Sequence, residues 1–141
     1  MANFPESIPD ISERGGERET AKRAHGQVIA VVDDDAAVCD STRFLLETHD
    51  FEVLTYLGGA AFLRNIPDVA CLIVDYQMPG LNGLEFVSEL RTRDRQVPTI
   101  MITATTDAAV ERRAAEIGIK RVLQKPLLGA VLLHAIREEL E

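Results

Sequence analysis

Residues 28–35 read Val-Ile-Ala-Val-Val-Asp-Asp-Asp, so an apolar run ends directly in a group of carboxylates. A second apolar run, Ala-Cys-Leu-Ile-Val at 70–74, ends at Asp75, and a weaker one at 122–123 leads to Lys125. Each run is typical of a buried strand. In a parallel sheet the carboxyl ends of the strands lie at one edge, where ligands bind. We therefore expect these carboxylates and the lysine to meet at one edge of a sheet.

After residue 26 the chain alternates strand-like and helix-like segments five times. Strands are expected at 27–32, 51–55, 69–74, 97–102 and 119–124, and helices at 36–48, 59–65, 82–93, 107–117 and 128–140. Such alternation with short connections predicts a parallel sheet with right-handed crossovers. The first, third and fourth strands are apolar on both faces, as central strands are, whereas the other two are mixed and suit the edges. The pattern predicts an α/β fold, a flavodoxin-like (βα)5 doubly wound sheet with strand order 2-1-3-4-5.

Local signals agree with the expected helix ends. Asn82 and Glu85 stand three residues apart, which is typical of a capping box at the start of the third helix. Asp107 is expected to cap the fourth helix, and Gly118 to end it. Asp35 is expected to start the first helix, where a carboxylate is favoured by the helix dipole.

The composition argues against several classes of protein. The 141 residues carry a formal net charge of −8 at pH 7, whereas a nucleic-acid-binding surface needs a basic patch. No apolar stretch approaches the ~20 residues of a membrane span, and no signal-peptide core stands at the N-terminus. Cys39 and Cys71 lie in apolar contexts and are expected to be buried free thiols. We therefore expect a cytoplasmic protein that binds neither nucleic acid nor a membrane.

Residues 1–26 differ from the rest of the chain. They contain prolines, paired glycines and mixed charges, with few large apolar side chains. Such a composition is typical of a flexible tail. We therefore divide the chain into an N-terminal tail at 1–26 and a folded domain at 27–141, which is long enough to bury a core.

The expected cluster of carboxylates predicts a particular chemistry. Carboxylates that share a pocket repel one another unless a cation neutralises them. Mg²⁺ prefers hard oxygen ligands and is held by one or two carboxylates together with phosphate and water. A carboxylate beside such an ion and an ammonium group is equipped to accept a phosphoryl group.

Four motifs, each at the end of an expected strand, resemble those of the response-regulator receiver domain of two-component signalling. Val-Val-Asp-Asp at 31–34 resembles its acidic pair, and Ile-Val-Asp-Tyr-Gln-Met-Pro-Gly-Leu-Asn-Gly at 73–83 its phosphoacceptor loop. Pro-Thr-Ile-Met-Ile-Thr-Ala at 98–104 resembles its fourth strand with the signalling hydroxyl. Gln-Lys-Pro-Leu at 124–127 resembles its lysine and the cis-proline that follows. The resemblance covers about 27–141.

The resemblance implies a role for each matching residue. Asp75 is the phosphoacceptor, and a sensor histidine kinase, a histidine phosphotransfer protein or a small phosphodonor supplies the phosphoryl group. Thr103 and Lys125 contact the phosphoryl oxygens, and Pro126 follows a cis peptide bond. The resemblance also implies Mg²⁺, or Mn²⁺ in its place. Its implied ligands are Asp33 through water, Asp34 and Asp75 directly, and the backbone carbonyl of Gln77, whose side chain is expected to be free.

The chain departs from the family at the switch that transmits the signal. The family often has Tyr or Phe three residues before the lysine, where this chain has Val122. The usual aromatic partner of the Thr103 hydroxyl is therefore missing, which puts the usual activation mechanism in doubt. For the acidic pair, we choose Asp33 and Asp34 over Asp35, because the family's pair directly follows the strand.

The resemblance implies a phosphoacceptor that signals through protein–protein contacts with a downstream protein target. It implies no enzyme, beyond self-catalysed phosphorylation and dephosphorylation. A homodimer through the fourth helix, fifth strand and fifth helix is a further expectation. Because the sequence ends at Glu141, just after the last helix, we expect no DNA-binding output domain. The chain is then a stand-alone receiver, or one cut from a longer protein.

Three other functions stay open on the residues alone. A phosphatase of the haloacid-dehalogenase type needs Asp-x-Asp-x-Thr or Asp-x-Asp-x-Val after the first strand, whereas Asp33 and Asp35 are followed by Ala37. A flavodoxin-like electron carrier needs a hydroxyl-rich phosphate loop where this chain has three aspartates. A receiver-like binding scaffold is favoured by the missing aromatic residue and disfavoured by the otherwise complete site.

Overall fold

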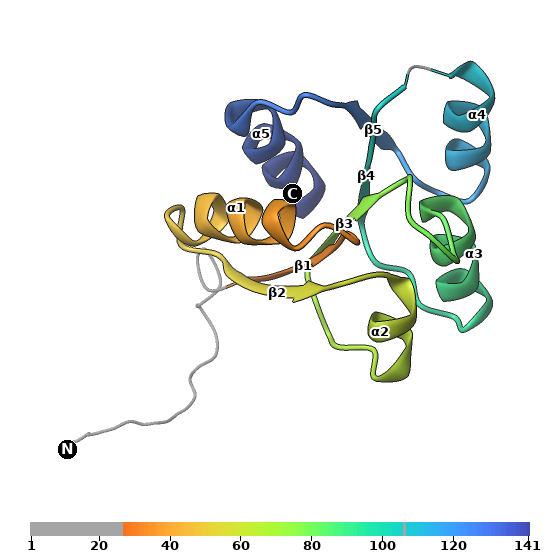
Figure 1. The fold of residues 1–141 in the computed structure, drawn as a ribbon, viewed down its shortest axis with the longest axis horizontal. Helices are drawn as coiled ribbons and strands as arrows, with labels where there is room; N and C mark the ends of the chain where they lie inside the picture. The colour runs from red at the N-terminus through yellow and green to blue at the C-terminus, as the bar shows by residue number, and fades with distance from the viewer. Residues whose placement is uncertain (1–26, 106) are drawn as a thin grey trace.

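The computed structural model describes residues 27–105 and 107–141, which form alternating strands and helices (Figure 1). The strands are β1 (Val28–Val32), β2 (Glu52–Tyr56), β3 (Cys71–Asp75), β4 (Thr99–Thr103) and β5 (Arg121–Gln124). The helices are α1 (Ala36–Glu47), α2 (Gly59–Arg64), α3 (Gly83–Thr92), α4 (Ala108–Glu116) and α5 (Gly129–Leu140). The predicted tail at 1–26 lies outside the described residues.

The five strands form one parallel sheet in the order β2-β1-β3-β4-β5, which confirms the predicted fold and strand order. The strands that are apolar on both faces lie in the middle of the sheet, and the mixed strands lie at its edges. All five carboxyl ends therefore point to one edge of the sheet. The register pairs Val32 with Val74 and Asp75 with Ile102, so the ends of β1, β3 and β4 are neighbours.

Helices cover both faces of the sheet (Figure 1). Alternate residues of the central strands point to opposite faces and enter two separate apolar clusters. One cluster joins the sheet to α2, α3 and α4 through side chains such as Phe62, Phe86 and Val110. The other joins it to α1 and α5 through side chains such as Leu46 and Ile136. Burial on both faces leaves the strand ends as the place where polar groups can gather.

The expected caps are present at three helices. Asp35 caps α1, because its side chain accepts hydrogen bonds from the N–H groups of Ala37 and Val38. Asn82 and Glu85 form a capping box at α3, and the Asp107 side chain accepts from Ala109 N–H at α4. A cap of this kind contributes about 1 kcal/mol.

Some strand boundaries differ from the prediction. Asp75 and Thr103 are the last residues of β3 and β4, because both still pair with residues of the next strand. The fifth strand was predicted from residue 119 but begins at Arg121. Gly118 has φ of 88°, and Ile119 N–H donates to Ala114 O, so these two residues still belong to the end of α4.

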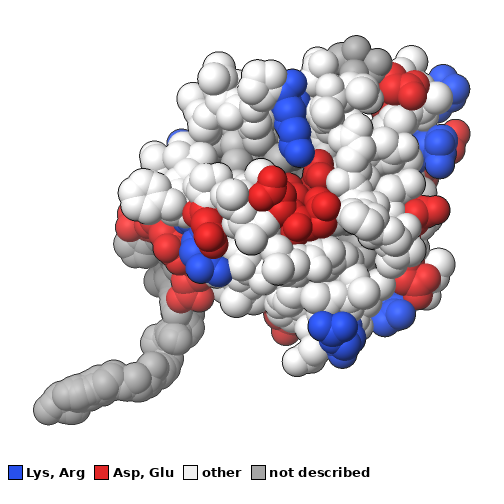
Figure 2. Space-filling view, in the orientation of Figure 1, with Lys and Arg blue, Asp and Glu red and all other residues white. Residues whose placement is uncertain are grey.

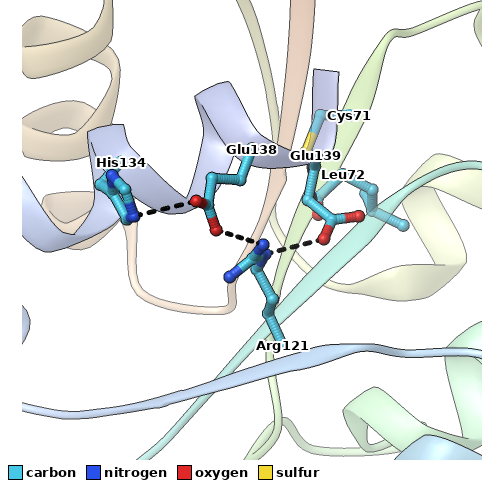
Figure 3. A network of polar contacts seen from close by, with 6 residues as sticks. All are labelled: Cys71, Leu72, Arg121, His134, Glu138 and Glu139. Carbon is cyan, nitrogen blue, oxygen red and sulfur yellow. Dashed lines mark hydrogen bonds and ion pairs between the residues drawn. The ribbon is translucent and has the colours of Figure 1, made fainter. Parts of the chain in front are cut away.

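Charged side chains hold α5 against the edge strand β5 (Figure 3). Arg121 Nε of β5 donates to Glu139 Oε2 at 2.8 Å, and the same guanidinium pairs with Glu138. His134 Nε2 lies 3.3 Å from Glu138 Oε2, one turn earlier in α5. The network joins the last turns of α5 to the strand that leads to Lys125.

Both cysteines are buried free thiols, as predicted. Burial raises the pKa of the Cys71 thiol to about 12, with a smaller effect from Glu139 nearby. Cys71 is therefore a core residue and not a reactive thiolate. Among residues 27–105 and 107–141, no helix is long and apolar enough to cross a membrane.

Candidate functional site

Three carboxylates from two neighbouring strand ends meet at the carboxyl edge of the sheet. Asp33 and Asp34 follow β1, and Asp75 ends β3. Oxygen atoms from the three side chains lie within 4.8 Å of one another. Figure 2 shows acidic side chains gathered on this face beside a basic side chain. The predicted meeting of these residues, which are far apart in the sequence, is therefore present in the structure.

The three aspartates after β1 face different surroundings. The side chains of Asp33 and Asp75 are each only 5% exposed, whereas Asp34 is exposed. Asp33 Oδ1 accepts a hydrogen bond from Asp35 N–H at 2.9 Å, which leaves its second oxygen for the pocket. Asp35 caps α1 and stands outside the cluster. This arrangement agrees with the choice of Asp33 and Asp34 as the acidic pair.

Lys125 reaches the same pocket from the end of β5. Its Nζ lies 3.1 Å from Asp75 Oδ1, across the end of β4. Its backbone N–H donates to Thr103 O at 2.8 Å, and the Lys125–Pro126 peptide bond is cis, the isomer that the resemblance implied. The pocket therefore holds a cationic group directly beside the candidate phosphoacceptor.

Burial makes the ionised carboxylates of this pocket unfavourable. The pKa of Asp33 is raised to about 6, mainly by burial and also by the charges of Asp75 and Asp34, against the opposing effects of the Asp35 N–H and Lys125. Burial also raises the pKa of Asp75, although Lys125 opposes this shift. Perturbed pKa values cluster at functional sites, so these two carboxylates mark the pocket as a candidate functional site.

The Asp75 carboxylate has an unsatisfied oxygen. Oδ1 is buried and, among the described residues, no donor makes a hydrogen bond with it. The Lys125 ammonium lies within ion-pair distance of this oxygen but not in hydrogen-bonding geometry. A hard cation shared by the carboxylates would satisfy this oxygen and reduce their repulsion. The donor set consists of oxygen atoms, so the pocket fits a metal ion such as Mg²⁺.

One expectation about Gln77 is wrong. Its side chain was expected to be free, but Gln77 Oε1 accepts a hydrogen bond from Ala104 N–H at 3.2 Å. Gln77 lies in the β3–α3 loop, and its long side chain reaches the first residue after β4. Its backbone carbonyl as a metal ligand stays a prediction. Nothing in the sequence pattern predicts this contact, because it depends on the distance between two loops.

Thr103 and Val122 occupy the places expected for the switch. Thr103 is 3% exposed at the end of β4, and its Oγ1 accepts a hydrogen bond from Thr105 N–H at 3.3 Å. Val122 lies opposite Met101 in the β4–β5 register and is half-buried against the cluster under α4. Their roles in signalling stay predictions.

Two further features of the site were not predicted from the sequence. Gly83 begins α3 so close to the site that a Cβ atom there would lie 2.8 Å from Asp75 O. A cavity of about 450 Å³ also opens beside Asp33 and Lys125, between α1 and the start of α5. Its apolar lining includes Leu45 and Leu127. The glycine could be noticed in the sequence, but its close approach and the cavity arise only from packing.

Comparisons with known proteins agree on one family. The family model described as "Response regulator receiver domain" matches residues 29–137. The transcriptional regulatory protein FixJ of Azorhizobium caulinodans is 36% identical over 114 residues, which cover 79% of this chain and 54% of that protein. The response regulator protein TmoT of Ectopseudomonas mendocina is 33% identical over 116 residues, covering 81% and 53%. The chain spans about half the length of the curated relatives that it matches.

Solved structures show the same fold. The crystal structure named FixJ-N has a TM-score of 0.74 and 29% identity, and it covers 82% of this chain and 94% of that chain. The structure named BeF3 Activated DrrB Receiver Domain has a TM-score of 0.73 and 26% identity, with 82% and 97% covered.

Proposed function

The chain belongs to the response regulator receiver domain family, and from this premise we propose that it accepts a phosphoryl group on Asp75. Membership of the family implies a phosphodonor partner such as a histidine kinase. We propose a sensor histidine kinase or a histidine phosphotransfer protein as the donor. The phosphorylated form then signals through protein–protein contacts with a downstream target.

The observation that carries this proposal is the state of Asp75. This carboxylate is buried, its Oδ1 lies 3.1 Å from the Lys125 ammonium, and one of its oxygens lies within 4.8 Å of carboxylate oxygens of Asp33 and Asp34. Like charges held this close are unfavourable for the fold alone and call for a cation. Asp75 therefore combines a place for a cation with adjacent positive charge, which suits a nucleophile in phosphoryl transfer.

Each residue of the pocket has its own role in the proposed phosphoryl transfer. An Asp75 oxygen attacks phosphorus as the bond from phosphorus to the donor nitrogen breaks, and the electron pair of that bond stays on the imidazole. Asp34, Asp75 and the Gln77 carbonyl directly, and Asp33 through water, would hold Mg²⁺ (or Mn²⁺), which supplies charge neutralisation. Lys125 contacts a phosphoryl oxygen, and the Thr103 hydroxyl donates a hydrogen bond to another. Such transfer depends on positioning and charge more than on covalent chemistry of the protein.

The partner surface follows from the position of the pocket. A donor must bring its phosphorylated side chain to Asp75, so its surface must cover the rim of the site. That rim includes the 450 Å³ cavity beside Lys125 and the exposed side chain of Leu128 at the start of α5. An apolar rim next to a charged pocket suits a protein donor, because apolar contacts strengthen a short-lived complex without adding charge.

The remaining expectations are part of the same proposal. The domain is a phosphoacceptor and not a turnover enzyme, it acts in the cytoplasm, and α4, β5 and α5 form its homodimer surface. It contacts neither nucleic acid nor a membrane. Because the chain spans about half the length of its curated relatives, the expected lack of a DNA-binding output domain stays a prediction.

Intact mass spectrometry tests the proposed phosphoacceptor. The protein is incubated with acetyl phosphate, with and without Mg²⁺, and wild type should gain the mass of one phosphoryl group only with the metal. Asp75→Asn should gain none. Asp68→Asn is the matched control, because Asp68 is an exposed aspartate before β3, at the opposite edge of the sheet. Labelling of Asp75→Asn at the wild-type rate would show that the phosphoacceptor is another residue.

A further inference from the structure

We propose that the Gln77 side chain competes with the phosphoryl group for the backbone N–H of Ala104. We call the hydrogen bond between Gln77 Oε1 and Ala104 N–H the Gln77 strap. In this proposal the strap holds the protein in its unphosphorylated arrangement and must break when Asp75 is modified. The inference rests on the proposed function, since it concerns the regulation of the Asp75 site.

The strap joins the loops that follow β3 and β4. It joins residues that are 27 positions apart in the sequence, over a distance of 3.2 Å between Oε1 and N. Gln77 stands two residues after Asp75, and Ala104 directly follows Thr103. Because β3 and β4 are neighbours and Asp75 pairs with Ile102, the strap connects the two loops that leave these strand ends. Both ends of the strap therefore lie at the edge of the sheet that carries Asp75.

A phosphoryl oxygen is a stronger acceptor than the Gln77 amide. Hydrogen bonds to a charged acceptor are roughly twice as strong as those between neutral groups. The strap is also weak for its kind, because 3.2 Å lies at the long end of the usual range for N–H···O contacts. Gln77 and Ala104 are both exposed, so water can solvate the amide oxygen once it is released. These conditions favour exchange of the Gln77 oxygen for a phosphoryl oxygen.

The loop after β4 contains a second hydrogen bond whose acceptor is also a neutral side-chain oxygen. Thr103 Oγ1 accepts a hydrogen bond from Thr105 N–H at 3.3 Å. Two backbone N–H groups that follow the buried strand β4 are thus each held by a side-chain oxygen. If a phosphoryl oxygen replaced Gln77 Oε1 as the acceptor of the Ala104 N–H, the start of the loop would be free to rearrange. This gives the domain a route for signal transmission that does not require an aromatic side chain at Val122.

The strap should lower the affinity of the site for a phosphoryl group. A neutral hydrogen bond that must be broken before another forms weakens binding by about two- to tenfold. Gln77→Ala removes the competing oxygen and keeps the backbone carbonyl that is assigned to the metal. Gln96→Ala is the matched control, because Gln96 is an exposed glutamine in the connection before β4, at the opposite edge of the sheet.

The test combines two measurements on the full chain. Amide exchange in the unmodified protein should show faster exchange of the Ala104 N–H in Gln77→Ala than in wild type or Gln96→Ala. Titration with beryllofluoride, a stand-in for the phosphoryl group, is then carried out at saturating Mg²⁺. Gln77→Ala should bind it about two- to tenfold more tightly than wild type, whereas Gln96→Ala should bind it as wild type does.

The possible results separate the strap from the proposed function. If wild type binds beryllofluoride and Gln77→Ala binds it equally or more weakly, each at its own saturating Mg²⁺ concentration, Gln77 does not compete and the inference is overturned. Unchanged exchange of the Ala104 N–H in Gln77→Ala overturns it as well. If wild type itself neither binds beryllofluoride nor becomes phosphorylated, the proposed function fails and the inference fails with it.

Discussion

Replacement of Asp33 by asparagine should stabilise the metal-free protein at neutral pH. The Asp33 side chain is only 5% exposed, and its pKa is raised from 3.8 to about 6, mainly by burial and further by neighbouring carboxylates. Asparagine has nearly the same shape and keeps the Oδ1 atom that accepts the hydrogen bond from Asp35 N–H. The substitution therefore removes the buried charge with little change in packing.

The magnitude follows from the difference in pKa between the folded and unfolded chains. A raised carboxyl pKa means that the folded protein binds the proton more tightly than the unfolded chain does. The stability contributed by protonated Asp33 is therefore fully present below pH 3.8 and is lost as the pH rises through about 6. A shift of about 2 pKa units corresponds to about 3 kcal/mol, at about 1.4 kcal/mol for each unit. We expect Asp33→Asn to recover about 2–3 kcal/mol at pH 7.

Urea unfolding between pH 4.5 and 7.5 in the presence of a chelator measures this effect. The free energy of unfolding of wild type should fall relative to Asp33→Asn as the pH rises, and the difference should shrink toward the acidic end. Asp68→Asn, which changes an exposed aspartate far from the pocket, should follow wild type. Added Mg²⁺ should stabilise wild type more than Asp33→Asn, since ligand binding adds to stability by mass action. Parallel pH profiles for wild type and Asp33→Asn would refute the assignment of a buried, repelled carboxylate at this position.

Three further substitutions test other parts of the site. Asp34→Ala should lose most of its Mg²⁺ affinity in calorimetry without loss of metal-free stability. Asp35→Ala should keep its Mg²⁺ affinity and lose about 1 kcal/mol of unfolding free energy, because the helix cap is missing. The opposite ranking of Mg²⁺ affinities would show that the acidic pair is Asp34 and Asp35. Lys125→Ala should still bind Mg²⁺ but show little of the amide-exchange response to beryllofluoride, and a full response would remove Lys125 from the phosphoryl contacts. Gly83→Ala should lower the unfolding free energy by about 1–3 kcal/mol, because its Cβ would lie 2.8 Å from Asp75 O; an unchanged urea midpoint would show that the start of α3 moves freely.

Much of the fold follows from local patterns in the sequence. Residues 28–32 and 71–74 are apolar without alternation, and only a strand covered on both faces buries such a run. That property placed β1 and β3 in the middle of the sheet. The capping box of Asn82 and Glu85 could be predicted because it depends on residues three apart. The predicted strand ends were less accurate. Asp75 and Thr103 are polar, yet each remains in its strand because it pairs with a neighbouring strand.

The candidate site likewise has features that local sequence patterns predict and features that only the folded chain produces. Local sequence patterns predict which groups meet, since parallel strands bring Asp33, Asp75 and Lys125 to one edge whatever the detailed packing. How those groups behave depends on the folded chain. The raised pKa of Asp33, the unsatisfied Asp75 Oδ1 and the hydrogen bond between Gln77 and Ala104 all depend on burial and on distances between separate loops. Solvent access and through-space contacts are properties of the folded chain as a whole, and no local pattern of residues encodes them.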